Sequence, residues 1–157
     1  MGTVWPHDNA LIAAGFRRYG FHTEACRIFT GIVEAATHFA HYRLPEVFAG
    51  FRRADYGIPV RYPVACHPQA WAAGSVPFLL TTILGLMPEA FAHRLRIVQP
   101  VLPDFLQQLE VHRLRVGEGH ADLRFARRAD GSVTVTVMRV EGQLDVVTDD
   151  EATAAKS

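Results

Sequence analysis

The sequence has few cysteines and no long apolar run, and these absences exclude several classes of protein. Its 157 residues include only 2 cysteines, Cys26 and Cys66, which form no CxxC motif and suggest no disulfide framework. Such thiols are typical of a reducing compartment, so we expect a cytoplasmic protein. No stretch of about 18 apolar residues is present, so we expect no transmembrane helix. Residues 1–8 also lack the basic and apolar regions of a signal peptide.

The sequence also lacks an excess of either charge. Its 16 Lys and Arg residues balance 16 Asp and Glu residues, so nothing favours binding to nucleic acid or to an anionic membrane. Histidines lie next to Cys66 and at positions 38 and 41, but neither place has the ligand number and spacing of a zinc site. We therefore expect no metal and no cofactor, and no nucleophilic role for Cys66.

The composition is that of an ordered globular protein, with 49% hydrophobic and 20% charged residues. The length suits one domain, or one domain with a small appendage. Residues 1–92 show helical patterns, whereas residues 93–148 show the patterns of strands. Residues 149–157 form a polar tail that we expect to be disordered.

Three helices are predicted in the first part of the chain. Asp8 or Asn9 could cap a helix that ends near Gly20. A second helix follows over residues 23–40, where apolar residues recur at three- and four-residue spacing, and the short link between the two predicts a helical hairpin. A third helix, over residues 68–85, is apolar on nearly every side and would need further partners to bury it.

The second part of the chain alternates between polar and apolar residues, which predicts strands. The alternating runs cover residues 95–98, 110–116, 121–128, 132–137 and 143–147. Asp130 and Gly131 are typical of a tight hairpin turn. We therefore expect an antiparallel meander that the last run completes.

A long irregular connection of about two dozen residues links the second and third predicted helices, and long loops in compact domains are usually functional. Glu46 lies in it among glycines, prolines and aromatic residues, including Phe48, Phe51 and Tyr62. A carboxylate placed there could take a proton from a water molecule. Alternatively, Glu46 is an exposed acid that caps a loop amide or pairs with a neighbouring arginine.

Residues 5–9, Trp-Pro-His-Asp-Asn, gather an aromatic ring and three polar groups at the start of a helix. Proteins bind sugars with this combination, because rings cover the C–H faces and carboxylates or amides bond the hydroxyls. The alternative is an ordinary helix cap with a buried tryptophan. Gln69 and Trp71 could line the same cavity from the opposite wall, although Trp71 could equally belong to the core.

Three motifs follow one another along the chain: Val4-Trp5-Pro6-His7-Asp8-Asn9-Ala10, Arg43-Leu44-Pro45-Glu46 with Gly50-Phe51, and Tyr62-Pro63-Val64-Ala65-Cys66 leading into Pro68-Gln69-Ala70-Trp71-Ala72. In this order they resemble the amylo-α-1,6-glucosidase, or glycogen-debranching, group of six-hairpin glycoside hydrolases, over roughly residues 3–148. The resemblance implies an (α/α)₆ toroid, with two rings of helices around the active site. It also implies inverting hydrolysis by two carboxylates, one a general acid and one a general base.

The resemblance places the general base on Glu46. It makes five other residues sugar-contacting or cavity-shaping positions: Trp5, His7, Asp8, Gln69 and Trp71. The substrate would be an α-glucan, cleaved at α-1,6 branches.

Three to four helices make up only part of a toroid, so we expect a mainly α chain with a partial (α/α)₆ toroid over residues 1–92 and a small β meander after it. The general acid and the rest of the barrel would lie upstream, in the same chain or another, and these residues alone would be inactive. Two alternatives are a non-catalytic carbohydrate-binding or assembly fragment, and a hydrolase of the same fold for another sugar, such as a glycosylglycerate or a trehalose-like disaccharide.

Overall fold

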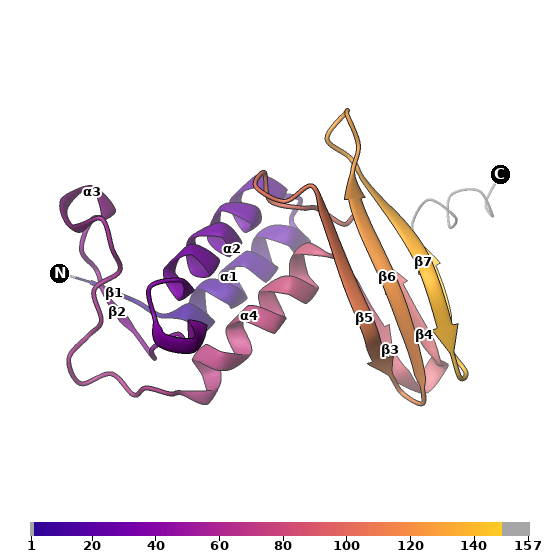
Figure 1. Ribbon diagram of the computed structural model, residues 1–157, viewed down its shortest axis with the longest axis horizontal. Coiled ribbons are helices and arrows are strands. Elements are labelled where there is room, and N and C mark those ends of the chain that lie inside the picture. Colours follow the sequence, from indigo (N-terminus) through magenta and orange to yellow (C-terminus); the bar gives the residue numbers. More distant parts are fainter. Residues whose placement is uncertain (1, 149–157) are drawn as a thin grey trace. The chain divides into compact units, whose positions relative to one another are not determined.

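The computed structural model describes residues 2–148, which form two compact units divided between Thr82 and Ile83 (Figure 1). The described residues are 35% helical and 30% strand, with four α-helices and eight strands in three sheets. The prediction of a mainly α chain that forms part of an (α/α)₆ toroid is therefore wrong. The prolines and glycines between the second and third helices leave that connection irregular, and strands begin at Leu86, before residue 92. The predicted disordered tail, residues 149–157, lies outside the described residues.

In the first unit, helices α1 (Pro6–Arg18) and α2 (His22–Ala36) lie side by side (Figure 1). The helical hairpin is confirmed, but neither predicted cap is. Trp5 occupies the N-cap position with an extended backbone and no side-chain cap, and Pro6 follows at a position where its fixed φ suits a helix start. Asp8 lies in the first turn, where its charge interacts favourably with the helix dipole.

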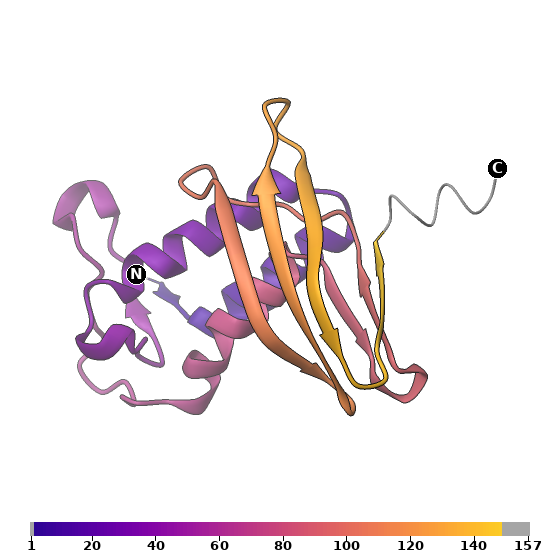
Figure 2. The ribbon, with the colours of Figure 1, turned by 45° about the vertical axis from the view of Figure 1, so that its right-hand side comes forward.

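Helix α4 (Ala70–Ile83) runs alongside α1 within this unit (Figures 1 and 2). It begins two residues later than predicted, because the Gln69 Oε1 atom accepts a hydrogen bond of 2.9 Å from the Ala72 amide and so caps the helix. At the other end the Arg17 side chain donates to the Thr82 carbonyl over 3.2 Å. No helix in the described part of the chain is long and apolar enough to cross a membrane.

The connection between α2 and α4 is irregular but tied down. It contains a 3₁₀ turn (Ala40–Tyr42), strand β2 (Phe48–Ala49) and the short helix α3 (Arg53–Tyr56). Strand β2 pairs antiparallel with β1 (Thr3–Val4) just before Trp5. A side chain at Gly50 would lie 2.3 Å from the Gly2 carbonyl oxygen, so only glycine allows this approach. The pairing joins the loop that carries Glu46 to the start of the chain.

The second unit contains two three-stranded sheets. One consists of β3 (Leu86–Glu89), β4 (Arg94–Ile97) and β8 (Asp145–Thr148), in the order β3-β4-β8, with β8 parallel to β4. The other is an antiparallel meander of β5 (Gln108–Val116), β6 (Gly119–Arg127) and β7 (Val133–Glu141). Figure 2 shows the sheets layered one behind the other. Their core includes the fully buried side chains Leu95, Ile97, Leu123 and Phe125.

The meander over β5, β6 and β7 confirms the predicted antiparallel strands and the turn at Gly131, whose φ is 86°. The predicted place of the last strand is wrong, because β8 leaves the meander and pairs with β4. Gly142 turns the chain with a φ of 74°, close to the Glu118 carbonyl, and redirects it to the other sheet. Alternation identifies a strand but not its partner.

Candidate functional site

Two tryptophans and a histidine form a cluster where helices α1 and α4 begin. The ring centroids of Trp5 and His7 are 5.5 Å apart, and those of His7 and Trp71 are 4.9 Å apart, both in edge-to-face arrangements. Trp71 is 65% exposed, so it is not the core residue that one sequence interpretation allowed. The structure thus brings residues from two of the motifs together and leaves one indole ring open to a ligand. We call Trp5, His7 and Trp71 the aromatic cluster.

Polar groups surround the aromatic cluster. The His7 Nε2 atom lies 3.3 Å from the Asp8 carboxylate, whose side chain is more than half exposed. The other ring nitrogen of His7, Nδ1, is buried and has no hydrogen-bond partner among the described residues. An exposed ring beside a carboxylate and an imidazole is chemically suited to a sugar.

Glu46 lies in the loop, half-buried, and is bonded to Cys66 twice. The Glu46 amide donates to the Cys66 carbonyl over 3.0 Å, and the Cys66 amide donates to the Glu46 Oε2 atom over 2.9 Å. This is the loop-amide cap that the sequence allowed as an alternative to catalysis. Of the neighbouring arginines, Arg53 pairs instead with Glu34 over 2.7 Å.

Gln69 has a structural task, since its amide oxygen caps α4. It lies between Cys66 and Trp71 in the sequence. One short segment therefore connects Cys66, which holds the Glu46 carboxylate, to the aromatic cluster. Cys66 and Trp71 are five residues apart, which limits their Cα–Cα distance to roughly 18 Å even if that segment is fully extended. All six predicted site residues therefore belong to the first unit and to connected parts of it.

Two of the aromatic residues that the sequence places near Glu46 line a cavity. Phe48 and Phe51 line a separate, mostly apolar cavity of about 180 Å³. Phe48 also packs against Phe39, with ring centroids 5.7 Å apart. The Glu34–Arg53 pair also lines this cavity. This cavity could not be predicted from the sequence, because many of its walls come from short, irregular segments.

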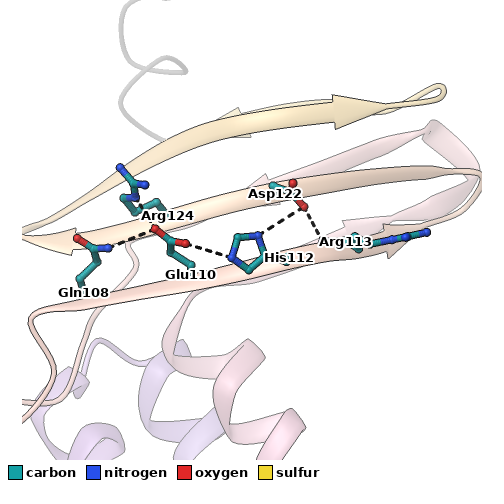
Figure 3. Close-up of polar contacts among 6 residues, drawn as sticks. All are labelled: Gln108, Glu110, His112, Arg113, Asp122 and Arg124. Atoms are coloured by element: carbon teal, nitrogen blue, oxygen red, sulfur yellow. Dashed lines mark hydrogen bonds and ion pairs between the residues drawn. The ribbon is translucent and has the colours of Figure 1, made fainter.

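The second unit carries a polar cluster on the meander (Figure 3). Glu110 is at its centre and accepts hydrogen bonds from Arg124 Nε over 2.7 Å and from Gln108 Nε2 over 3.3 Å, while His112 Nε2 lies 3.1 Å away. The hydrogen bond from Arg124 is the main cause of the lowered pKa of Glu110. From the sequence, Glu110, His112 and Arg124 were expected only as parts of strands, and Gln108 lay outside every predicted strand.

Asp122 lies next to this polar cluster and accepts a hydrogen bond at a place where the strand pairing is interrupted. Its Oδ1 atom accepts a bond of 2.6 Å from the Arg113 amide, at a bulge in β5 between Val111 and Leu114 (Figure 3). Arg113 adopts a φ of 53°, which a non-glycine residue seldom takes. In the described part of the chain no group of histidine, cysteine and acidic residues could hold a metal ion. The hydrogen bond from the Arg113 amide to Asp122 thus stabilises the bulge in β5.

Together these features describe a protein with a helical unit that carries a carboxylate and an aromatic cluster, and a unit of two layered sheets. A comparison with known families finds no family that matches this chain, and no curated protein matches it either.

Proposed function

We propose that Glu46 and the aromatic cluster belong to the carbohydrate site of a glycoside hydrolase that cleaves α-glucosidic bonds, with α-1,6 branches of a glucan as substrate. The observation that carries the proposal is the arrangement of Trp5, His7 and Trp71 beside the Asp8 carboxylate. The exposed indole of Trp71 would cover the C–H face of a glucose ring, and Asp8 would accept hydrogen bonds from its hydroxyls.

Glu46 would act as the general base of an inverting reaction. Its carboxylate takes a proton from a water molecule, whose oxygen forms the new bond to the anomeric carbon. The bond from that carbon to the leaving oxygen breaks at the same time, and the leaving oxygen takes a proton from a general acid. We place that acid, and the rest of the cavity, outside the described residues, in the same chain or in a partner. A cytoplasmic location is part of the proposal and agrees with the thiols of Cys26 and Cys66, which form no disulfide within the described residues.

The test uses a substrate that needs no general acid. Fluoride leaves as a stable anion without a proton from the protein, so a site with only its base should hydrolyse α-glucosyl fluoride but not a branched α-glucan. We expect slow fluoride release by this chain, and a loss of roughly a hundredfold in Glu46→Gln, because glutamine cannot take up the proton. Glu24→Gln, an exposed acid of α2, is the matched control. If Glu46→Gln released fluoride as fast as the unaltered chain, Glu46 would not be the general base. Cleavage of the branched α-glucan by the unaltered chain would show that the general acid is present.

A second candidate is a carbohydrate-binding module without catalysis. The hydrogen bond from the Cys66 amide to Glu46 favours it, because the carboxylate then has a purely structural task. Calorimetric titration with isomaltose, trehalose and glucosylglycerate distinguishes the sugars. Binding by the unaltered chain without any fluoride release identifies the binding module.

A further inference from the structure

We propose that the cavity between helix α2 and the loop of residues 48–60 binds a small monocarboxylic acid, whose apolar body is about the size of one six-membered ring. The cavity has a volume of about 180 Å³, and its lining residues all belong to the first unit. An apolar cavity of roughly 150 Å³ can hold benzene, so there is room for a single ring. Neither Glu46 nor the aromatic cluster lines it, so this site is separate from the proposed carbohydrate site.

Contacts within the protein hold the apolar walls of the cavity in place. Phe48 is only 6% exposed. The Ala49 amide donates to the Val60 carbonyl over 2.9 Å, which closes the loop between them. The rings of Phe51 and Tyr56 pack with their centroids 4.4 Å apart. The walls are therefore formed before a ligand arrives, and binding does not have to order a loop.

Gly31, in the interior of α2, opens the cavity on the side of that helix. A Cβ atom added at Gly31 would meet no other atom within 4 Å, although the residue lines the cavity. The backbone there is helical and does not require glycine, and a glycine in a helix interior lowers stability relative to other residues. A side chain at this position would therefore extend into the cavity and reduce its volume.

Arg53 supplies a cationic group at the mouth of the cavity. Its Nη1 atom donates to the Glu34 Oε2 atom over 2.7 Å, and both residues line the cavity. The Nε and Nη2 atoms of Arg53 make no hydrogen bond to any other residue that the structure describes. Since the side chain is 74% exposed, this edge of the guanidinium is open to a ligand. Such an edge can donate two parallel hydrogen bonds to a carboxylate.

The charges at the mouth favour a single carboxylate over a dianion or an amine. Glu34 lies beside Arg53 and would repel a dianion, such as a phosphate monoester, more strongly than a carboxylate. An amine would have to compete with Arg53 for the Glu34 carboxylate, which is already bonded. His38 also lines the cavity, and its ring can donate a further hydrogen bond to an anionic ligand.

The first experiment measures the binding of 4-fluorophenylacetate to the full chain by fluorine NMR titration. We expect a Kd on the order of 1 mM, a usual value for a ligand of about eleven non-hydrogen atoms. Gly31→Met should fill the cavity and weaken binding roughly tenfold or more, while Tm does not fall, because methionine favours the helix. Gly15→Met in α1 is the matched control, since Gly15 is also a helical glycine with open space around it and does not line the cavity. It should leave Kd unchanged.

The second experiment tests the charges at the mouth with the same titration. Arg53→Gln removes the cation and should weaken binding roughly tenfold. Arg52→Gln, at an exposed arginine that does not line the cavity, is its control and should leave Kd unchanged. Glu34→Gln keeps an oxygen that can hold Arg53 in place but removes the negative charge, so it should bind the anion about two- to threefold more tightly. Glu24→Gln is the control for this variant.

Two related compounds complete the test, the neutral 4-fluorophenylacetamide and the cationic 4-fluorobenzylamine. Both should bind more weakly than 4-fluorophenylacetate, because neither offers a carboxylate to Arg53. Equal Kd values for the acid and the amide would overturn the assignment of a carboxylate ligand, as would tighter binding of the amine that is lost in Glu34→Gln. Equal Kd values for Gly31→Met and the unaltered chain would show that the acid does not bind in this cavity. The absence of binding to the unaltered chain would overturn the inference as a whole.

Discussion

Replacement of Trp71 by Ala should weaken sugar binding while leaving the protein folded. The side chain is 65% exposed, so about a third of it is buried. A fully buried tryptophan covers up to about 250 Å², so this third corresponds to about 90 Å² and, at about 25 cal/mol per Å², to roughly 2 kcal/mol. Alanine keeps part of that burial. We therefore expect the free energy of unfolding to fall by roughly 1–2 kcal/mol, which leaves a folded protein.

The effect on binding comes from the exposed part of the ring. About 160 Å² of indole remains open, and a glucose ring stacked on it would cover about half, again worth up to roughly 2 kcal/mol by the same area estimate. Since 1.4 kcal/mol is a factor of ten in Kd, the variant should bind about ten times more weakly. Calorimetric titration with isomaltose measures Kd, and urea unfolding measures the stability of the same sample.

The matched control is Tyr19→Ala, because Tyr19 is 78% exposed and lies at the opposite end of α1 from Trp5. It should leave Kd unchanged. An equal Kd for Trp71→Ala and the unaltered chain would refute the assignment of the aromatic cluster as a sugar platform, whatever happens to stability.

Two further predictions concern the polar cluster of the second unit, and both are measured by urea unfolding. Asp122→Ala leaves the Arg113 amide without its acceptor and should lower the free energy of unfolding by about 1–3 kcal/mol. Asp122→Asn keeps an acceptor oxygen and should lower it clearly less. Equal losses in the two variants would show that this hydrogen bond is not responsible. Because its pairing with Arg124 lowers the pKa of Glu110, this pairing stabilises the fold fully at pH values above the ordinary glutamate pKa. The stabilisation is lost as the pH falls through the lowered pKa. Arg124→Gln should therefore reduce the free energy of unfolding at pH 7, and the reduction should shrink as the pH falls below the ordinary glutamate pKa; an equal reduction at every pH would contradict this account.

Regular periodicity made the helical hairpin and the meander predictable. In α2 the buried residues Ala25, Phe29, Ile32 and Ala36 follow the three- and four-residue spacing read from the sequence. In β6 burial alternates along the strand, with Leu123 and Phe125 inside. Each pattern depends on local geometry alone, so a single sequence is enough to recognise it.

The errors arose where long-range pairing decides the structure. The strand β3 is only four residues long and contains Pro88, so alternation was not visible. The partner of β8 lies about fifty residues earlier in the chain, in β4. For the site, sequence motifs identified Trp5 and Trp71 but could not show that His7 packs between them, nor that Phe48 and Phe51 line a cavity.

The Glu46 carboxylate accepts a hydrogen bond from the Cys66 amide and has one proposed catalytic task, and a glutamine substitution separates the two. Glutamine has nearly the shape of glutamate and keeps an oxygen that can accept the same hydrogen bond, but it cannot act as a base at neutral pH. Alanine removes both abilities. A loop cap alone therefore predicts that Glu46→Ala loses stability while Glu46→Gln is nearly unchanged in every assay. A general base predicts that both variants lose hydrolysis, although only the alanine variant loses stability. The glutamine variant decides between these interpretations, because it alone keeps the loop and removes the chemistry.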